Sequence, residues 1–377
     1  MGKNIGIITL HYSDNYGSVL QAYALQTYFE KKADLNAWII DYIQSYDAMN
    51  YKLFRTEIYR HRPQAFLADV IFTGKNRRRK ASFEKFRKEY LHMTEEKYDS
   101  LEQLKNLNRK MDAFVCGSDQ IWNFDCTNGI DKAYFLAFAD QSKKKIAYAP
   151  SFGQASFEID EMKKIRPYLK DFNLISVREK SMRGRLEKEI GKPVKCVVDP
   201  TLLLGREYYD QLCEGQKKTN KYVFVYMLEE NLALLNDAKK YAEKNKLDII
   251  YISNISKKGQ VILKKYTNAY GATPGEFLEY IKNAECVITN SFHATVFSIL
   301  YEKKFCTYKT KYSFPRMLDL LENLGLSSRV FDENFEMGSR IYYKAVQAKL
   351  DQMREISVTY LQDAIDLINE DGKTEVN

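Results

Sequence analysis

The sequence predicts an α/β protein with two Rossmann-like, doubly wound domains that face a cleft and are followed by C-terminal helices. Two series of apolar, strand-like runs alternate with helix-length segments and meet near residue 200, where Asp199-Pro200 begins a turn. This alternation implies parallel strands joined by right-handed crossovers. The length of 377 residues also suits about two domains. We expect domains at 1–200 and 201–338, then closing helices and a tail at 339–377.

The first series begins with a β-α-β unit and contains one interruption. A strand at 4–10, a polar loop, a helix at 18–31 and a strand at 37–43 form the unit. Residues 51–98 are basic and helical in composition, so we interpret them as an insertion. Later strands are expected at 113–116, 145–149, 174–177 and 195–198, with helices at 100–107, 159–170 and 179–189.

The second series repeats the rhythm after a polar stretch at 214–221. Strands are expected at 222–227, 248–252, 285–289 and 305–308, and helices at 231–244, 274–283, 292–301 and 314–324. Residues 339–368 have the pattern of one or two closing helices.

Composition limits the class of protein. Hydrophobic residues make up 45% and charged residues 29%, as in soluble globular domains. No apolar run approaches the roughly 20 residues of a membrane helix, and no secretory signal is visible, so we expect a cytoplasmic protein. The net charge of +8 suits an anionic substrate, an anionic membrane surface or nucleic acid equally well, although a solvated basic surface is the ordinary explanation.

The six cysteines form no Cys-x-x-Cys pair, and three of them lie in apolar runs, so we interpret these as buried thiols. There is also no phosphate-binding Walker motif, no Gly-x-Gly-x-x-Gly after the first strand, no His-Glu-x-x-His and no Asp-x-Asp. We therefore expect no metal site and no cofactor.

Polar stretches follow several predicted strands, where ligands of doubly wound folds bind. Asn15, Tyr16 and Gly17 form a loop that leads into a helix N-terminus, which suits an anion or a hydroxyl-rich ligand, or simply makes a turn. In the stretch at 117–123, Ser118 and Asp119 offer polar groups. Trp122 offers a ring for a sugar, unless it lies in the core.

Two charged residues end neighbouring strands of the first domain. Arg178 follows the strand at 174–177 and could bind phosphate or carboxylate with both arms of its guanidinium, or form a surface ion pair with Glu179 or Asp199. Asp199 could accept a hydrogen bond from a sugar, orient a basic partner, or cap the turn that it begins.

His293 is the candidate general base. Ser291 is a natural N-cap, so His293 falls in the first helical turn, where the helix dipole disfavours the imidazolium form. A structural histidine is the alternative, and His11 is the only rival for the catalytic role. Arg316 and Arg329 flank a later helix, and each could line the cleft or lie on the surface.

Taken together, these stretches resemble the polysaccharide pyruvyl transferase family. The matching elements occur in the family's order from residue 4 to about 330: Asn15-Tyr16-Gly17 with the following helix, Gly117 to Trp122, Ser176-Val177-Arg178-Glu179, Asp199-Pro200 and Ser291-Phe292-His293-Ala294. The resemblance implies a glycosyltransferase-B fold, phosphoenolpyruvate as donor and a sugar of a surface polysaccharide, or of its lipid-linked precursor, as acceptor.

The resemblance also implies roles for residues. Arg178 and Arg316, with Ser291 and His293, would bind the donor, and His293 and Arg178 would be catalytic. Asn15, Tyr16, Gly17, Ser118, Asp119, Trp122 and Asp199 would contact the acceptor. A proton would go to the methylene carbon, one sugar hydroxyl would attack the adjacent carbon, and a second would displace phosphate to close a pyruvate ketal. The chain departs from the family in one respect, because Ser291 stands where many members have the arginine of Arg-x-His.

Two other functions stay open. A glycosyltransferase with a nucleotide-sugar donor would need a carboxylate after a late strand to hold the ribose, where this chain has Asn290 and Ser291. A non-catalytic protein could bind an anion or the membrane surface through the basic run at 75–80. That run lacks interleaved aromatic residues, so we expect no nucleic-acid partner.

Overall fold

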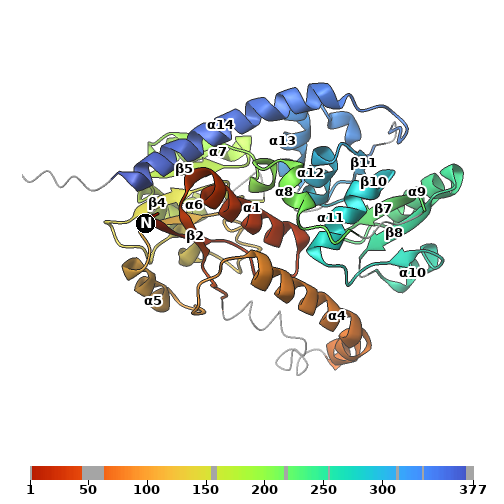
Figure 1. Ribbon diagram of the computed structural model, residues 1–377, viewed down its shortest axis with the longest axis horizontal. Helices are drawn as coiled ribbons and strands as arrows, with labels where there is room; N and C mark the ends of the chain where they lie inside the picture. Colours follow the sequence, from red (N-terminus) through yellow and green to blue (C-terminus); the bar gives the residue numbers. More distant parts are fainter. Residues whose placement is uncertain are drawn as a thin grey trace, which may run out of the picture.

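The computed structural model describes residues 2–44, 63–153, 159–215, 220–253, 255–310, 314–332 and 335–370. The chain forms two α/β domains, and a long C-terminal helix, α14 (Tyr343–Asn369), lies along both of them (Figure 1). Its first turn contacts the second domain, where the hydroxyl of Tyr343 donates to the carbonyl of Ser298. Its later part packs on the first domain, where the hydroxyl of Tyr360 donates to the carbonyl of Ala147.

The first domain contains a parallel sheet with the order β2-β1-β3-β4-β5-β6 within the described residues. Its strands are β1 (Asn4–Ile8), β2 (Asn36–Ile39), β3 (Ala113–Cys116), β4 (Lys144–Ala147), β5 (Leu174–Val177) and β6 (Val194–Cys196). Its helical segments are α1 (Tyr16–Ala33), α4 (Pro63–Tyr90), α5 (Leu101–Leu104), η1 (Lys105–Arg109), η2 (Lys132–Phe135), α6 (Ile159–Lys170), α7 (Lys180–Ile190) and η3 (Pro200–Leu202).

The second domain contains a parallel sheet with the order β11-β10-β7-β8-β9, again within the described part of the chain. Its strands are β7 (Tyr222–Tyr226), β8 (Asp248–Ile252), β9 (Thr267–Asn268), β10 (Cys286–Thr289) and β11 (Lys304–Thr307). Its helical segments are α8 (Arg206–Asp210), α9 (Leu232–Asn245), α10 (Lys257–Ile262), α11 (Pro274–Asn283), α12 (Phe292–Leu300), α13 (Phe314–Leu324) and η4 (Ser327–Arg329).

The predicted α/β order is confirmed, with differences at short elements. The strand expected at 37–43 ends at Ile39, because the chain beyond it makes only the single bridge from Tyr42 to Tyr98. The sequence analysis missed α8, α10 and β9, which are too short to show a hydrophobic period. None of the helices in the described ranges is long and apolar enough to cross a membrane.

Local sequence signals explain the helix that leads into the site. The side chain of Asn15 accepts a hydrogen bond from the backbone N–H of Gly17 (2.9 Å) and so caps the N-terminus of α1. Asp34 ends the helix in the left-handed conformation, with Lys31 and Lys32 in the last turn, where cations favour the dipole. Thus α1 begins at a fixed point directly after β1.

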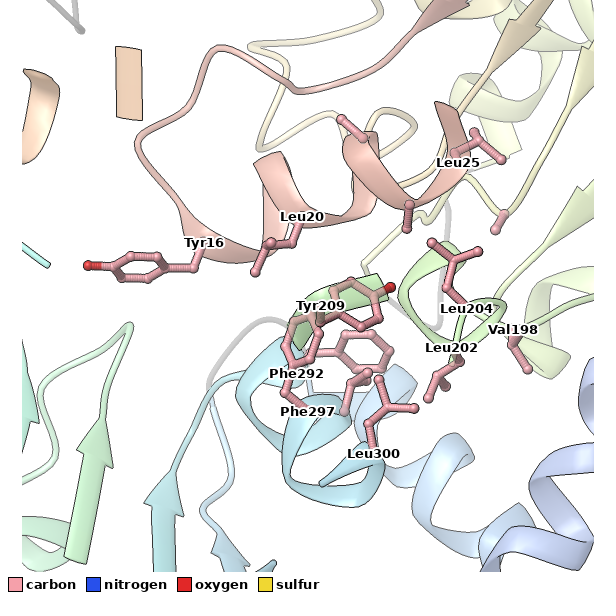
Figure 2. Packing of buried hydrophobic residues seen from close by; sticks show 14 of the residues in the cluster. Tyr16, Leu20, Leu25, Val198, Leu202, Leu204, Tyr209, Phe292, Phe297 and Leu300 are labelled. Atoms are coloured by element: carbon pink, nitrogen blue, oxygen red, sulfur yellow. The ribbon is translucent and has the colours of Figure 1, made fainter. Parts of the chain in front are cut away.

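A hydrophobic core crosses the boundary between the domains. Leu20 of α1, Leu202 of η3, Tyr209 of α8, and Phe292 and Phe297 of α12 lie in one buried cluster (Figure 2). Because burying a large apolar side chain contributes about 1.5–3 kcal/mol, this cluster holds the two domains in a fixed orientation. It also brings the start of α12 close to the first domain.

The insertion helix α4 adds a second link between the domains through Arg79 of the basic run, whereas its neighbours Arg77 and Arg78 are exposed, as a solvated face requires. Arg79 donates to the carbonyls of Asp14 (2.6 Å) and Tyr270 (3.0 Å), and to the hydroxyl of Tyr16 (3.1 Å). Its guanidinium also lies 4.9 Å from the ring centres of Tyr16, Phe83 and Tyr270. Residues 51–62 of the predicted insertion lie outside the described residues.

Candidate functional site

The candidate site lies where the carboxyl ends of strands from both sheets meet. Asp119 follows β3, Arg178 follows β5 and Asp199 follows β6, all in the first domain. His293 lies in the first turn of α12, just after β10, and Arg316 lies in α13. Each of these five side chains is at least 90% buried.

Asp199 is the central anion of the site. Its Oδ2 accepts a hydrogen bond from Nη1 of Arg178 (2.5 Å). Its Oδ1 accepts from the backbone N–H and the hydroxyl of Thr201 (3.0 and 2.6 Å), so Asp199 also caps the turn, as the alternative interpretation expected. Burial alone would raise the pKa of Asp199, but the charges of Arg178 and His293 outweigh it and hold that pKa well below its usual value.

His293 meets Asp199 across the domain boundary. Its Nε2 lies 3.6 Å from Oδ2 of Asp199, which is beyond hydrogen-bonding distance but close enough for the carboxylate to attract the ring whenever the ring is protonated. Nε2 has no hydrogen-bond partner among the described residues. The imidazole rests on Gly17, where a Cβ would come within 1.9 Å of Nδ1. His293 is therefore positioned by the first domain although it belongs to the second.

Two guanidinium groups share one aromatic ring. The guanidinium carbons of Arg178 and Arg316 lie 5.3 and 5.1 Å from the ring centre of Phe292, a cation–π geometry. Burial and then the charge of Arg178 lower the pKa of Arg316 to about 10. The site thus brings two guanidinium groups together at a buried point.

Asp119 balances part of this charge. Its Oδ2 accepts from the hydroxyl of Ser18 (2.7 Å), and its Oδ1 lies 3.7 Å from Nη2 of Arg178 and 4.0 Å from Nη1 of Arg316. The neighbouring Ser118 donates to the carbonyl of Ala149 (2.8 Å) and lies 3.5 Å from Oδ2 of Asp199. These contacts fix the loop after β3 beside the two arginines.

Several buried polar atoms of the site lack a hydrogen-bond partner within the described residues. They are Nε and Nη2 of Arg178, Nε and Nη1 of Arg316, Nε2 of His293 and Oε2 of Glu179. A buried donor without a partner costs about 1–3 kcal/mol, and in native folds ordered water, a bound ion or a ligand satisfies such groups. Four guanidinium donors therefore fit an anion with several oxygen atoms.

A pocket of about 450 Å³ opens onto these arginines. It lies between α7 and β6 of the first domain, α12 and α13 of the second, and α14. Its lining includes Arg178, Asp199, Phe292 and Arg316. Among the described residues, no cluster of His, Cys, Asp and Glu could hold a metal ion.

A family model of polysaccharide pyruvyl transferases matches residues 15–312, which is most of the chain and contains Asn15, Arg178, Asp199 and His293. The chain belongs to the polysaccharide pyruvyl transferase family. It is therefore a member of a transferase family, as the resemblance implied. No curated protein matches the chain significantly.

Solved structures share the fold of this transferase family member at low sequence identity. The S. aureus MnaA–UDP complex matches with a TM-score of 0.54 at 12% identity and 98% coverage of both chains. A UDP-N-acetylglucosamine 2-epimerase from Rickettsia bellii matches with a TM-score of 0.53 at 11% identity, and the match also covers 98% of both chains. A UDP-glucosyltransferase from Polygonum tinctorium matches with a TM-score of 0.51 at 10% sequence identity, and the match covers 98% of this chain and 99% of that one. These matches confirm the glycosyltransferase-B-like fold.

Two residues that the resemblance assigned to the acceptor lie inside packed cores of this pyruvyl transferase family member, so the prediction that they contact the acceptor is wrong. Trp122 is 0% exposed, stacks on Phe135 (5.3 Å) and donates its indole N–H to the carbonyl of Tyr134 (3.0 Å), so its ring cannot contact a sugar. Tyr16 is also 0% exposed and stacks on Phe277 of α11 (4.3 Å), which makes it part of the contact between domains.

The remaining predicted residues divide into those at the site and those elsewhere. Ser291 caps α12 by accepting from the N–H of Ala294 (3.4 Å), and Asn15 caps α1. His11, the rival histidine, contacts Thr9 and Asp41 through its two ring nitrogens, which leaves neither available. Arg329 donates to the carbonyl of Ser339 (3.3 Å), apart from the other arginines.

Sequence reasoning missed three features of the site. Phe292 was quoted within its motif, but its contact with two arginines was not foreseen. Gly17 was read as a ligand-binding loop residue, whereas it makes room for His293. Glu179 is buried and accepts from the hydroxyl of Ser151, a pairing between the loops after β4 and β5. Of these three features, only the role of Phe292 could have been inferred from the sequence, because Phe292 directly precedes His293.

Proposed function

We propose that this protein transfers the enolpyruvyl-derived group of phosphoenolpyruvate to two hydroxyls of one sugar and forms a pyruvate ketal. The observation that carries the proposal is the pair of buried arginines, Arg178 and Arg316, with unpartnered donors beside His293. Phosphoenolpyruvate carries a phosphate and a carboxylate, and each is an anion that a guanidinium binds with two parallel hydrogen bonds.

Arg316 supplies the cation that the family's Arg-x-His motif would otherwise provide. Ser291 occupies the position of that arginine and caps the helix instead. Arg316 enters from α13, and its guanidinium packs on Phe292, the residue next to His293. In this proposal Arg178 and Arg316 bind the two anionic groups of the donor, and Phe292 holds both guanidiniums in position.

His293 acts as the proton carrier in the proposed reaction. A hydroxyl of the sugar attacks C2 of the donor and its proton passes to His293, which delivers a proton to C3, so that C3 becomes a methyl group. A second hydroxyl then attacks C2, the C2–O bond to phosphate breaks, phosphate leaves with the electron pair, and the proton of this hydroxyl passes through His293 to the phosphate. Asp199 orients His293 and Arg178 together, and the arginines stabilise the leaving phosphate.

A nucleotide-sugar donor has less support in the second domain. The side chain of Asn290, which follows β10, accepts from the N–H of Leu228 (2.8 Å) and donates to the carbonyl of Glu229 (2.7 Å). Its amide is thus used to fix the loop after β7. The solved structures with this fold include proteins described with UDP or UDP-sugars, so UDP-N-acetylglucosamine is the right comparison ligand.

The test is thermal unfolding of the purified protein with phosphoenolpyruvate, and separately with UDP-N-acetylglucosamine. A ligand at a hundred times its dissociation constant raises the free energy of unfolding by about 2.7 kcal/mol. We expect stabilisation by phosphoenolpyruvate, and His293→Gln should keep this stabilisation while losing phosphate release with an acceptor. Stabilisation by UDP-N-acetylglucosamine with none by phosphoenolpyruvate would replace the proposed donor.

A further inference from the structure

A second pocket lies at the edge of the first sheet that is opposite the candidate site. It has a volume of about 230 Å³. Its lining residues are Asn4, Trp38, Thr94, Glu95, Glu96, Leu107, Lys110 and Met111. Asn4 begins β1 and Met111 precedes β3, so the pocket adjoins the amino ends of these strands, whereas the candidate site follows the carboxyl ends. Leu107 belongs to η1, which follows α5 at the end of the first domain remote from the second domain (Figure 1).

Trp38 forms an aromatic wall of this pocket. Ala37 and Ile39 of β2 are buried in the core, and the alternation along the strand turns Trp38 to the other face. Gly6 of β1 is the partner of Trp38 in the sheet register and has no side chain to cover the ring. Trp38 keeps 36% of its surface exposed, whereas Trp122, the other tryptophan of the sequence, is 0% exposed. Part of the Trp38 ring is therefore open to a ligand.

The rest of the lining combines an apolar floor with a polar rim. Leu107 and Met111 are buried apolar residues. Lys110 donates to Glu96 (2.6 Å), which fixes this pair at the rim. Glu95 is exposed beside them and makes no ion pair within the described ranges. The lining thus holds two carboxylates and one ammonium group, so unlike the candidate site it does not attract an anion such as phosphoenolpyruvate.

We propose that this pocket binds one neutral sugar ring of a polysaccharide. Trp38 stacks on the C–H face of the pyranose, Glu95 accepts hydrogen bonds from its hydroxyls, and Lys110 donates to them. Pockets for drug-sized ligands measure about 300–1,000 Å³, so this smaller pocket suits a single ring.

The pocket adds a second contact to a polysaccharide, away from the reacting sugar. A polysaccharide offers many sugar units, so one unit can bind at Trp38 while the chain remains a substrate of a polysaccharide pyruvyl transferase family member. The inference depends on this family membership and not on the identity of the donor. It therefore goes beyond the proposed function and can be tested without phosphoenolpyruvate.

The first test is acrylamide quenching of tryptophan fluorescence in the whole protein. The probes are the methyl glycosides of glucose, galactose, mannose and N-acetylglucosamine. Trp122 is buried, so acrylamide quenches mainly Trp38. We expect at least one glycoside to protect Trp38 and to produce a saturable loss of quenching. Protection by none of the four would overturn the inference.

Titration calorimetry with the protecting glycoside is the second test. Trp38→Ala and Glu95→Ala should each weaken its binding about tenfold, because the first loses the stacking face and the second a charged hydrogen bond. Trp38→Tyr keeps an aromatic ring and should retain most of the affinity. Tyr342→Ala and Glu102→Ala are the controls, since both residues are exposed and lie outside the lining. Glu95 is exposed, so its variant tests the site even if Trp38→Ala does not fold.

A third comparison separates this pocket from the candidate site. Arg316→Met should bind the glycoside as the unaltered protein does, and a tenfold loss would place the sugar at the candidate site instead. Unchanged affinity in both Trp38→Ala and Glu95→Ala, or tighter binding of tetramethylammonium than of any glycoside, would also overturn the inference. If the glycoside binds as expected while phosphoenolpyruvate does not bind, the proposed donor fails and the sugar site stands.

Discussion

A methyl group on Gly17 would come within 1.9 Å of Nδ1 of His293. Gly17 lies in the first turn of α1 in the first domain, and His293 lies in the first turn of α12 in the second. The imidazole is thus held against the backbone of the opposite domain. The glycine is needed for this contact, because its neighbours leave no room for a Cβ.

We expect Gly17→Ala to displace His293 and to reduce turnover at least about tenfold, since a misplacement of about 1 Å can cost 100-fold. Thermal unfolding and phosphate release measured on the same preparation would check this. Gly184→Ala is the matched control, because Gly184 lies in α7 with no atom near its missing Cβ. There alanine should stabilise the protein by about 0.4–1 kcal/mol. Full turnover in Gly17→Ala would show that the imidazole position is unimportant.

Replacing Asp199 should destabilise the protein and disturb both of its basic partners. Asp199→Asn leaves the buried guanidinium of Arg178 without its carboxylate, and removal of one partner of a buried ion pair costs about 3–5 kcal/mol. Urea unfolding at pH 7 would measure the loss. If the free energy of unfolding were unchanged, the pair of Arg178 and Asp199 would contribute nothing to stability.

The same variant gives a prediction for acidic pH. The pKa of Asp199 is held well below its ordinary value of 3.8, so its stabilising contribution is present above that value and is lost as pH falls through the folded-state pKa. The stability difference between the unaltered protein and Asp199→Asn should therefore shrink as pH falls below about 4. Urea unfolding of both proteins at a series of acidic pH values measures this difference in the free energy of unfolding. A difference that does not change with pH would contradict the lowered pKa of Asp199.

Arg79 should matter for stability far more than its neighbours in the basic run. Arg79→Ala removes three hydrogen bonds that join α4 to Asp14, to Tyr16 of α1 and to Tyr270 of the second domain, together with its contacts to three aromatic rings, one of them in α4 itself. We expect a loss of about 2–4 kcal/mol in unfolding free energy. Arg77→Ala is the control, since Arg77 is exposed on the same helix. Equal behaviour of the two variants would show that Arg79 contributes no more to stability than its exposed neighbours.

Much of the site could be predicted from the sequence, because its residues follow strands. The carboxyl ends of parallel strands meet at one edge of a sheet, so the positions of Asp119, Arg178 and Asp199 directly after strands predicted them at the ligand-binding edge. His293 was predicted in the same way, because it follows the predicted strand at 285–289 and falls in the first turn of the next helix. The hydrophobic period gave the long helices and the buried strands.

The remainder depends on tertiary contacts that no local pattern contains. Trp122 and Tyr16 stand beside polar loops in the sequence, but both side chains are turned into cores by partners far along the chain. Arg79 could not be distinguished from the adjacent arginines before its partners in the second domain were known. The resemblance already assigned Arg316, and not Arg329, to the donor, but the contact of Arg316 with Phe292 could not be predicted from the sequence.

Arg316 should bind ligand at a cost to the stability of the fold. Burial and the charge of Arg178 lower its pKa to about 10, so the charged form destabilises the folded state at every pH below that value, and the cost disappears as pH rises above it. At pH 7 we expect Arg316→Met to leave the free energy of unfolding unchanged or to raise it by up to about 3 kcal/mol. Urea unfolding measures this change.

The same Arg316→Met variant should bind phosphoenolpyruvate at least about tenfold more weakly, because it loses charged hydrogen bonds to the donor. Arg329→Met is the control: Arg329 is equally buried but contacts Ser339 and Phe335, so donor affinity should be kept. Calorimetric titration with phosphoenolpyruvate distinguishes the two. An Arg316→Met protein that is less stable yet binds the donor normally would make Arg316 a structural residue and leave the donor phosphate without its second cation.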